Sequence, residues 1–209
     1  MKLRAPLYML RHGETAWNTE RRMQGTRDST LTDLGRRQAL AVGRALRAEL
    51  ERAPGPTIFW RSPLGRVRET AEIVGRELGL GPTDWREDHR LRELSYGEWE
   101  GQNWKEIEAV RPNALNDWKA DPHGFCPPGG ETHFELRRRS AEFLAEVAAM
   151  GVRTVVLGHG VSGAVVRGLH LGLDAQAMFV LPKPQDAFFR LLGGREERIA
   201  ATLEPSPRA

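Results

Sequence analysis

Apolar residues along the chain fall into short continuous runs and into longer segments of helical spacing. Residues 7–10 are apolar at every position and stop at Arg11, which predicts a buried strand. The β-branched run at 154–157 predicts a second central strand. The expected strands are residues 7–10, 57–60, 154–157, 187–192 and 199–203, with a short strand and loop within 84–94, and the expected helices are residues 32–52, 63–79, 131–150 and 160–171.

Strands and helices of these lengths alternate along most of the chain. That alternation predicts an α/β fold with a largely parallel central sheet and helices on both faces. Residues 97–130 break the pattern with tryptophans, prolines and a Pro-Pro-Gly-Gly turn, so we expect a lid-like insertion there. A chain of 209 residues fits one domain. We therefore predict a single domain over residues 1–204, followed by a frayed tail at 205–209.

Charge and composition argue against several classes of partner. The net charge of +3 comes from 31 basic and 28 acidic residues mixed along the chain, which is unlike a nucleic-acid-binding surface. The densest basic run, Arg137–Arg139, is expected on the solvated face of a helix. No run approaches the roughly 18 apolar residues of a membrane span, and the first apolar run is too short for a signal peptide. We expect a cytoplasmic protein with no membrane or nucleic-acid partner, and the sequence leaves its oligomeric state open.

The candidate metal and redox groups are sparse. Cys126 is the only cysteine, so it has no partner within the chain for a disulfide and is expected to be an inert packing residue. His123 with Cys126, and His133 with Glu131, are the nearest pairs of ligand type. Neither pair has a recognised ligand spacing or a carboxylate cluster to complete it, so no metal site is predicted.

Two His-Gly pairs are the strongest chemical signal. His12 follows the first predicted strand, and His159 follows the strand at 154–157. Carboxyl ends of parallel strands meet at one edge of a sheet, where α/β proteins bind ligands, so these two histidines are expected to face each other. Arg-His-Gly alone is a weak motif, and a lone histidine is more often structural. The residues around it carry more information.

The segment around His12 closely resembles the signature of the histidine phosphatase superfamily, which includes cofactor-dependent phosphoglycerate mutases and many small-molecule phosphatases. The similarity recurs in order over residues 7–163, and ordered motifs are a stronger signal than any one of them. The matching segments are Leu10–Asn18 (LRHGETAWN), Met23–Gly25 (MQG), Ser62–Ala71 (SPLGRVRETA), Leu91–Gly101 (LRELSYGEWEG), Pro128–Glu131 (PGGE) and Leu157–Gly160 (LGHG).

The resemblance implies a reaction through a phosphohistidine at His12. Its neutral imidazole attacks phosphorus, which splits ester hydrolysis into a phosphoryl transfer and an attack by water. Arg11, Arg66 and a protonated His159 would stabilise the charge that spreads over the phosphoryl oxygens. Glu93 would protonate the leaving oxygen and later accept a proton from water. This chemistry needs no metal and no cofactor.

Further residues of the matching segments are candidates for contact with a small phosphorylated substrate. Asn18 and Gln24 carry neutral donors for phosphate, although Asn18 is equally suited to a turn and Gln24 to the surface. Arg22 lies in the loop expected to select substrates, and Gly160 belongs to the second His-Gly pair.

Three functions are compatible with this family, namely phosphatase, cofactor-dependent phosphoglycerate mutase and non-catalytic phospho-ligand-binding module. Mutases typically carry Glu-Arg-x-Tyr-Gly at the acid segment and a longer basic insertion, whereas this chain has Leu94 in place of the arginine and no such insertion. A complete set of reactive residues argues against a binding module. We therefore predict a phosphoric monoester hydrolase. Arg86, Arg90 and Arg92 are the candidates for the second anion site that the alternative, a mutase, would need.

Overall fold

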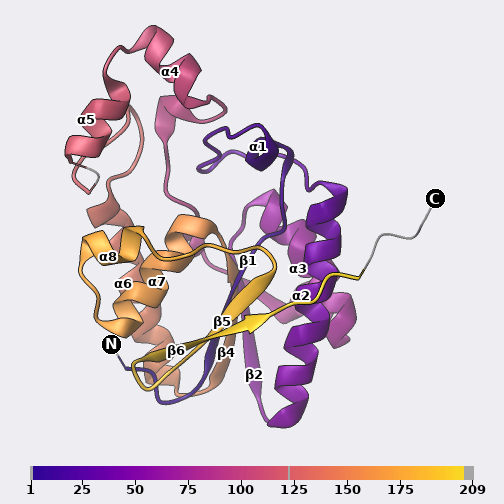
Figure 1. Ribbon diagram of the computed structural model, residues 1–209. Helices are drawn as coiled ribbons and strands as arrows, with labels where there is room; N and C mark the ends of the chain where they lie inside the picture. The colour runs from indigo at the N-terminus through magenta and orange to yellow at the C-terminus, as the bar shows by residue number, and fades with distance from the viewer. Residues whose placement is uncertain (1, 122, 205–209) are drawn as a thin grey trace.

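A mixed sheet of six strands forms the centre of the protein (Figure 1). The structure is a computed structural model, and it describes residues 2–121 and 123–204. The strand order is β3-β2-β4-β1-β5-β6. The first four strands of this order are parallel, and β5 and β6 are antiparallel to their neighbours. The strands are β1 (Leu7–Arg11), β2 (Thr57–Arg61), β3 (Trp85–Glu87), β4 (Arg153–Gly158), β5 (Ala187–Leu192) and β6 (Arg195–Ala200).

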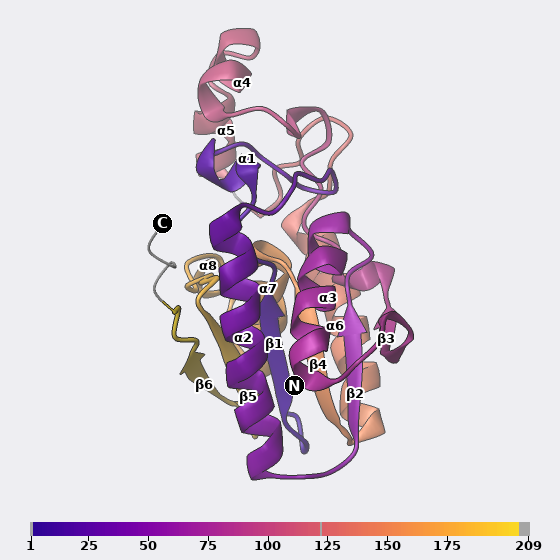
Figure 2. The same cartoon turned by 90° about the vertical axis from the view of Figure 1, so that its right-hand side faces the viewer.

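Helices cover both faces of the sheet, as the alternation of strands and helices predicted (Figure 2). Helices α2 (Asp33–Arg52) and α3 (Gly65–Leu78) pack on one face, and α6 (His133–Met150) and α7 (Gly160–Leu171) pack on the other. The predicted α/β fold class is therefore confirmed.

The two-residue period of a strand explains how one apolar run builds two cores. In β1, Tyr8 and Leu10 pack against α2 and α3, whereas Leu7 and Met9 pack against α6 and α7. Successive side chains of a strand point to opposite faces, so a strand buried on both sides must be apolar at every position. Burying such a side chain contributes about 1.5–3 kcal/mol, and this sandwich holds the sheet between its helices.

A cap stands at the carboxyl ends of the parallel strands. We use this name for the described residues of 97–130, which carry α4 (Trp104–Val110) and α5 (Ala114–Ala120) beside the short α1 (Ala16–Thr19) (Figure 1). Trp99 lies 5.4 Å from Phe125 and 5.5 Å from Trp104 between ring centroids, and Trp118 lies 5.2 Å from Phe179 of α8 (Ala175–Phe179). These aromatic contacts give the cap a small core that also joins it to the body of the protein.

Several predicted boundaries differ from the structure. The last strand is β6 rather than residues 199–203, because Gly193 and Gly194, with φ of 60° and 80°, form a tight turn that begins the return strand at once. Helix α3 begins at Gly65 rather than Pro63, because the Asp28 carboxylate accepts the N–H groups of Gly65 and Arg66 and thereby caps the helix. The tail predicted at 205–209 lies outside the described residues.

Two expectations about side chains were wrong. Cys126 is exposed rather than packed. Arg139, expected on a solvated face, donates to Glu131 and to the carbonyl oxygens of Arg90, Arg92 and Glu93, because α6 runs directly behind that segment. Arg139 therefore holds the acid-bearing segment in place.

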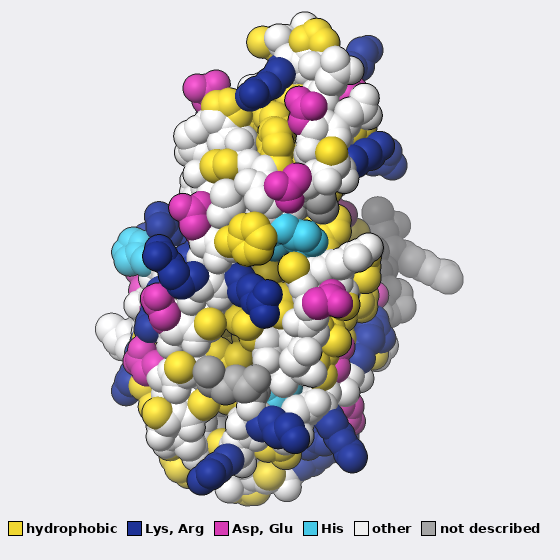
Figure 3. Space-filling model, turned by 90° about the vertical axis from the view of Figure 1, so that its left-hand side faces the viewer, with side chains coloured by type: hydrophobic (Ala, Val, Ile, Leu, Met, Phe, Trp, Pro, Cys, Tyr) yellow, Lys and Arg dark blue, Asp and Glu magenta, His cyan; other side chains and the backbone are white. Residues whose placement is uncertain are grey.

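Charges of both signs are mixed on one face of the molecule. On the face drawn in Figure 3, basic side chains are scattered over the body and the cap, with carboxylates and apolar side chains among them. Among the helices of the described residues, none is both long enough and apolar enough to cross a bilayer.

Candidate active site

The sheet brings His12 and His159 together. Strands β1 and β4 are parallel neighbours in which Arg11 pairs with Gly158, so the residue after each pair leaves the sheet at the same edge. The two imidazole centroids lie 5.3 Å apart in an edge-to-face arrangement, and both side chains are buried. The expected juxtaposition of the two His-Gly pairs thus follows from strand register.

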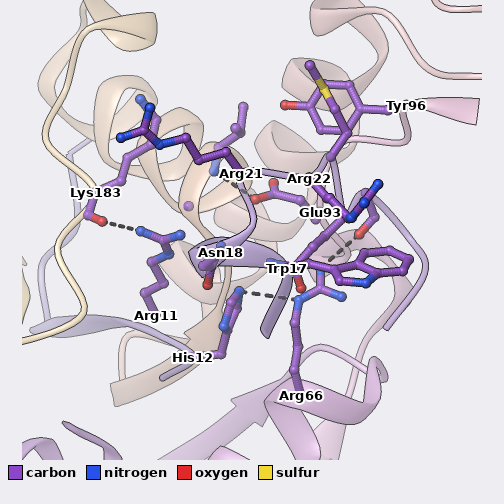
Figure 4. Close-up of a pocket in the computed structure, with 15 residues that line it drawn as sticks. Arg11, His12, Trp17, Asn18, Arg21, Arg22, Arg66, Glu93, Tyr96 and Lys183 are labelled. Carbon is purple, nitrogen blue, oxygen red and sulfur yellow. Dashed lines mark hydrogen bonds between the residues drawn. The ribbon is translucent and has the colours of Figure 1, made fainter. Parts of the chain in front are cut away.

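Hydrogen bonds set the tautomer of His12. Its Nδ1 lies 2.8 Å from the carbonyl oxygen of Gly13, which can only accept, so Nδ1 carries the proton. Nε2 then has a free lone pair, and it accepts a 3.2 Å bond from Nε of Arg66 (Figure 4). A Cβ on Gly13 would lie 2.2 Å from the carbonyl oxygen of Gly35, so only glycine permits this close packing against α2.

Arg66 is preorganised by contacts with one loop. Its guanidinium donates to the carbonyl oxygens of Gly25 and Arg27, at 2.8 and 2.6 Å, and to the Asp28 carboxylate at 2.9 Å. Arg66 is 2% exposed, and an arginine is almost never buried to that extent unless its guanidinium is paired. These bonds hold a cation beside His12 with little freedom left to lose on binding.

Arg11 approaches the pocket from the opposite side (Figure 4). One guanidinium nitrogen donates to the carbonyl oxygen of Lys183, whereas the buried Nε has no partner in the described residues. An unpaired buried donor is costly, about 1–3 kcal/mol. Anion binding beside Arg11 would relieve that cost.

Glu93 is fastened to the first turn of α7. One carboxylate oxygen accepts the N–H groups of Leu94 and Ser162, at 3.0 and 2.8 Å, and the other accepts that of Val161 at 2.9 Å. A carboxylate oxygen can accept two hydrogen bonds, so the oxygen facing Val161 retains one free position for a proton. The positive end of the helix dipole also favours a carboxylate here.

Electrostatics keep both histidines neutral in the free protein. Burial, with Arg11 and Arg66 nearby, holds the pKa of His12 well below its usual value. Burial and the charge of Arg66 do the same for the pKa of His159. His159 was expected to be protonated, but here its Nε2 lies 2.8 Å from the Ser62 hydroxyl and its buried Nδ1 has no partner in the described residues. An arriving phosphate dianion favours its charged form.

Three further candidates, Asn18, Gln24 and Gly160, also line the pocket. The Asn18 carbonyl accepts from Thr15 N–H and from Gln185, both at 3.1 Å, so its amide nitrogen is left to face the pocket. The buried Gln24 accepts a 3.4 Å bond from Ser29. Gly160 lines the pocket next to Arg11, where a Cβ would touch the guanidinium at 3.4 Å.

Arg22 lines the same pocket but is already neutralised. Its guanidinium bonds Glu20 and Glu106, each at 2.6 Å, and the carbonyl oxygen of Gly101 at 2.8 Å. Glu106 belongs to α4. Arg22 therefore ties its loop to the cap, and its role as a substrate contact stays a prediction.

The pocket has a volume of about 280 Å³. Sequence reasoning did not single out Trp17, Arg21, Tyr96 and Lys183, which also line it. Trp17 and Tyr96 belong to motifs already recognised, whereas nothing near Lys183 in the sequence marks it. Burial and the charges of Glu93 and Glu100 raise the pKa of Tyr96, so its phenol stays a neutral donor.

One buried carboxylate joins the two loops that line the pocket. Glu100 accepts the N–H groups of Thr26, Arg27 and Tyr96, together with the hydroxyl groups of Thr26 and Ser95. The loop that holds Arg66 and the segment that carries Glu93 are thereby positioned by the same side chain.

The candidate second anion site does not lie in this pocket. Arg86 is exposed with its guanidinium 5.5 Å from the Trp60 ring, and Arg90 pairs with Asp88 and Glu146 at 2.5 and 2.6 Å. Arg92 is exposed beside a separate hollow. Arg90 and Arg92 lie in or beside the short turn at His89–Leu91, which packs against α6 away from the pocket, and Arg86 lies in β3.

The described residues hold no cluster of His, Cys, Asp and Glu suited to a metal ion. The ring of His123 lies 5.7 Å from that of His133, and both rings pack on Phe179 between the cap and α6.

Stability is expected to fall as the pH drops from 7 to 5. Burial, reinforced by His123 and Lys183 and opposed by Glu93 and Glu131, lowers the pKa of His133 to about 4. The unfolded chain then takes up protons before the folded one does, so the stability present above pH 6.5 is lost on acidification, by up to about 1.4 kcal/mol per pH unit for each such histidine. Urea unfolding at pH 7, 6 and 5 measures this slope.

The matched variants for this test are His133→Phe and His89→Asn. Phenylalanine preserves the ring packing on Phe179 without a titrating group, so the slope should become shallower. His89 is exposed, and its replacement should leave the slope as it is. Equal slopes in wild type and His133→Phe would refute the assignment.

Comparison with known proteins places these features in a family. The chain matches the family model of the Histidine phosphatase superfamily (branch 1) over residues 7–200. It is 38% identical over 143 residues to a glucosyl-3-phosphoglycerate phosphatase of Mycobacterium tuberculosis (strain CDC 1551 / Oshkosh), a match that spans 68% of this chain and 60% of that protein. It is 38% identical over 177 residues to the probable phosphoglycerate mutase GpmB of Salmonella paratyphi C (strain RKS4594), spanning 82% of this chain and 77% of that protein.

Solved structures agree with these matches. Bacillus stearothermophilus YhfR superposes with a TM-score of 0.76 at 31% identity, covering 94% of this chain and 96% of that one. The family match takes in both strand ends, the helix that carries Arg66 and the segment that carries Glu93. The chain belongs to the histidine phosphatase superfamily.

Proposed function

We propose that this protein is a phosphatase that hydrolyses small phosphomonoesters through a phosphohistidine at His12. The observation that carries the proposal is a neutral His12 whose Nε2 lone pair faces a pocket between two arginines, with the Glu93 carboxylate also lining it. A neutral imidazole, fixed charge for the phosphoryl oxygens and a proton carrier are what a phosphoryl transfer to histidine needs.

The first half-reaction begins when substrate replaces the bond between Arg66 and His12. Nε of Arg66 then turns to a phosphate oxygen, which frees Nε2 of His12 to attack phosphorus in line. As the N–P bond forms, the P–O bond to the leaving group breaks and its electron pair stays on the ester oxygen. Glu93 carries its proton on the carboxyl oxygen that faces Val161, and it gives this proton to the ester oxygen of the leaving group.

The second half-reaction returns the site to its starting state. Water attacks the phosphohistidine, Glu93 takes one of its protons, and the electron pair of the N–P bond returns to Nε2. Inorganic phosphate leaves, and Arg66 can again donate to His12. Arg11 and Arg66 face the phosphoryl oxygens in both steps, and the dianion favours a proton on His159.

Two features of the structure support hydrolysis over isomerisation. Leu94, at the position where mutases typically carry arginine, is buried among Leu136, Val165 and Met178 and supplies no charge. Of the described residues that line the pocket, none belongs to the cap at 97–130. A mutase must shield its phosphoenzyme from water while the intermediate turns over, and no described residue of the cap reaches the pocket to provide that shield.

The test is an incubation with 3-phosphoglycerate and 2,3-bisphosphoglycerate in EDTA, followed by phosphorus NMR, beside an assay of p-nitrophenyl phosphate. We expect release of inorganic phosphate, little 2-phosphoglycerate and hydrolysis of the aryl ester. Activity should survive EDTA, since the proposed charge stabilisers are side chains. Isomerisation that runs orders of magnitude faster than phosphate release would assign the protein as a mutase instead, and no turnover of any ester would leave a binding module.

A further inference from the structure

The pocket carries more positive charge than one phosphate group requires. Five cationic side chains line it, Arg11, Arg21, Arg22, Arg66 and Lys183, against the single carboxylate of Glu93. Arg22 is neutralised by two carboxylates, and Arg66 by Asp28. Arg11 and Arg66 flank His12, where the reacting phosphoryl group would lie. Arg21 and Lys183 are the cations left over.

Arg21 is an exposed residue that lines the pocket from a strained backbone position. Its φ of 55° lies in the left-handed region, which residues other than glycine adopt at an energetic cost. Such residues are concentrated at ligand sites. The backbone N–H donates to the carbonyl oxygen of Asn18 at 3.2 Å, which ends the α1 turn. Within the described residues the Arg21 guanidinium has no hydrogen bond or ion pair, so its donors are available to a ligand.

Lys183 is a second cation, and it reaches the pocket from the loop that follows α8. Its Nζ donates to the carbonyl oxygens of Phe179 and Leu181, at 2.7 and 3.1 Å, and an ammonium group has three donors. One donor therefore remains for a ligand. Figure 4 shows Arg21 and Lys183 on the Arg11 side of the pocket, across from Trp17 and Arg66.

We infer that the preferred substrates carry a second anionic group, a carboxylate or a further phosphate, held by Arg21 and Lys183 while the reacting phosphate lies at His12. This inference rests on the proposed function and narrows its substrate class. Within the described residues neither Arg21 nor Lys183 forms a salt bridge with a carboxylate, although both line the pocket. A second anion beside them gains charge-assisted hydrogen bonds, which a neutral ester of the same size does not.

The experiment uses substrate pairs that differ only in the remote group. D-3-Phosphoglycerate and sn-glycerol 1-phosphate differ by a carboxylate against a hydroxymethyl group, and fructose 1,6-bisphosphate and fructose 6-phosphate differ by a phosphate. Wild type should favour the acidic member of at least one pair by about tenfold in kcat/KM, and the pair that discriminates identifies the second anion. Arg21→Gln should remove that preference through KM, because the lost contact is made equally in the ground and transition states.

Two further variants separate charge from backbone effects. Arg21→Gly suits the left-handed φ and also removes the side chain, so it should lose the preference as Arg21→Gln does. Arg86→Gln removes an exposed arginine outside the pocket and should retain the wild-type preference. A wild type that turns over both members of each pair equally, or an Arg86→Gln that loses the preference as fully as Arg21→Gln, overturns the inference. Failure to hydrolyse any of these esters contradicts the proposed function itself.

Discussion

Replacing His12 with alanine should lower kcat by about a thousandfold or more, because the group that accepts the phosphoryl is removed and water must attack the ester directly. The fold should survive, since His12 is neutral and its ring is one of many contacts at the end of β1. Steady-state assays with p-nitrophenyl phosphate, together with thermal unfolding, measure both effects. A variant that keeps more than about a tenth of the wild-type rate would exclude His12 as the nucleophile.

The same prediction has a direct chemical readout. Wild type quenched in alkali during turnover should carry a phosphoryl group on the peptide that contains His12, because phosphohistidine resists alkali. His12→Ala should carry none. His89→Ala serves as the control, since His89 is an exposed histidine outside the pocket and its replacement should alter neither rate nor labelling.

Replacing Glu93 with glutamine should separate substrates by their leaving groups. A poor leaving group such as the glycerol alkoxide needs the proton from Glu93, so its kcat/KM should fall by about a hundredfold to a thousandfold. p-Nitrophenolate leaves without a proton, so kcat/KM for its ester, which reports only the phosphoryl transfer to His12, should fall by less than about tenfold. Rates for the two esters, measured side by side, give the ratio.

The contacts of Glu93 explain why the ratio is a better measure than either rate. In Glu93→Gln the amide NH2 group faces the N–H of Val161, so two hydrogen-bond donors meet and neither has an acceptor. This should cost about 1–3 kcal/mol of stability. Such a structural loss would slow both esters alike. Equal slowing of both would therefore assign Glu93 to holding the N-terminus of α7 rather than to proton transfer.

The sheet and its main helices could be predicted from the sequence because each has one dominant pattern. Strand β1 is apolar at every position, and α2 and α6 are long enough to show helical spacing over several turns. Helices α4 and α5 span seven residues each, too few for the period to stand out, and they are stabilised by ring contacts such as that between Trp118 and Phe179. Those contacts join residues far apart in the chain, so local pattern does not reveal them.

The residues of the candidate site likewise include some that local sequence pattern could place and some that it could not. His12 and His159 could be placed together because strand ends and parallel pairing determine where a residue leaves the sheet. Lys183 could not, since it lies in the loop after α8 and reaches the pocket only through tertiary packing. Arg139 was misjudged for a related reason, because its partners at residues 90–93 are more than forty positions away. Charge along a chain indicates solvent exposure only where no distant partner is present.

The bonds made by Glu100 bear on how such a pocket can diversify. This one carboxylate receives Thr26 and Arg27 from one loop and Ser95 and Tyr96 from the other. A new sequence in either loop must preserve the backbone geometry that presents these donors, since an unpaired buried carboxylate is strongly unfavourable. The two loops are therefore expected to change together in evolution. A chimera that exchanges residues 22–28 without residues 93–101 would combine two loops whose backbones do not both match the hydrogen bonds of Glu100.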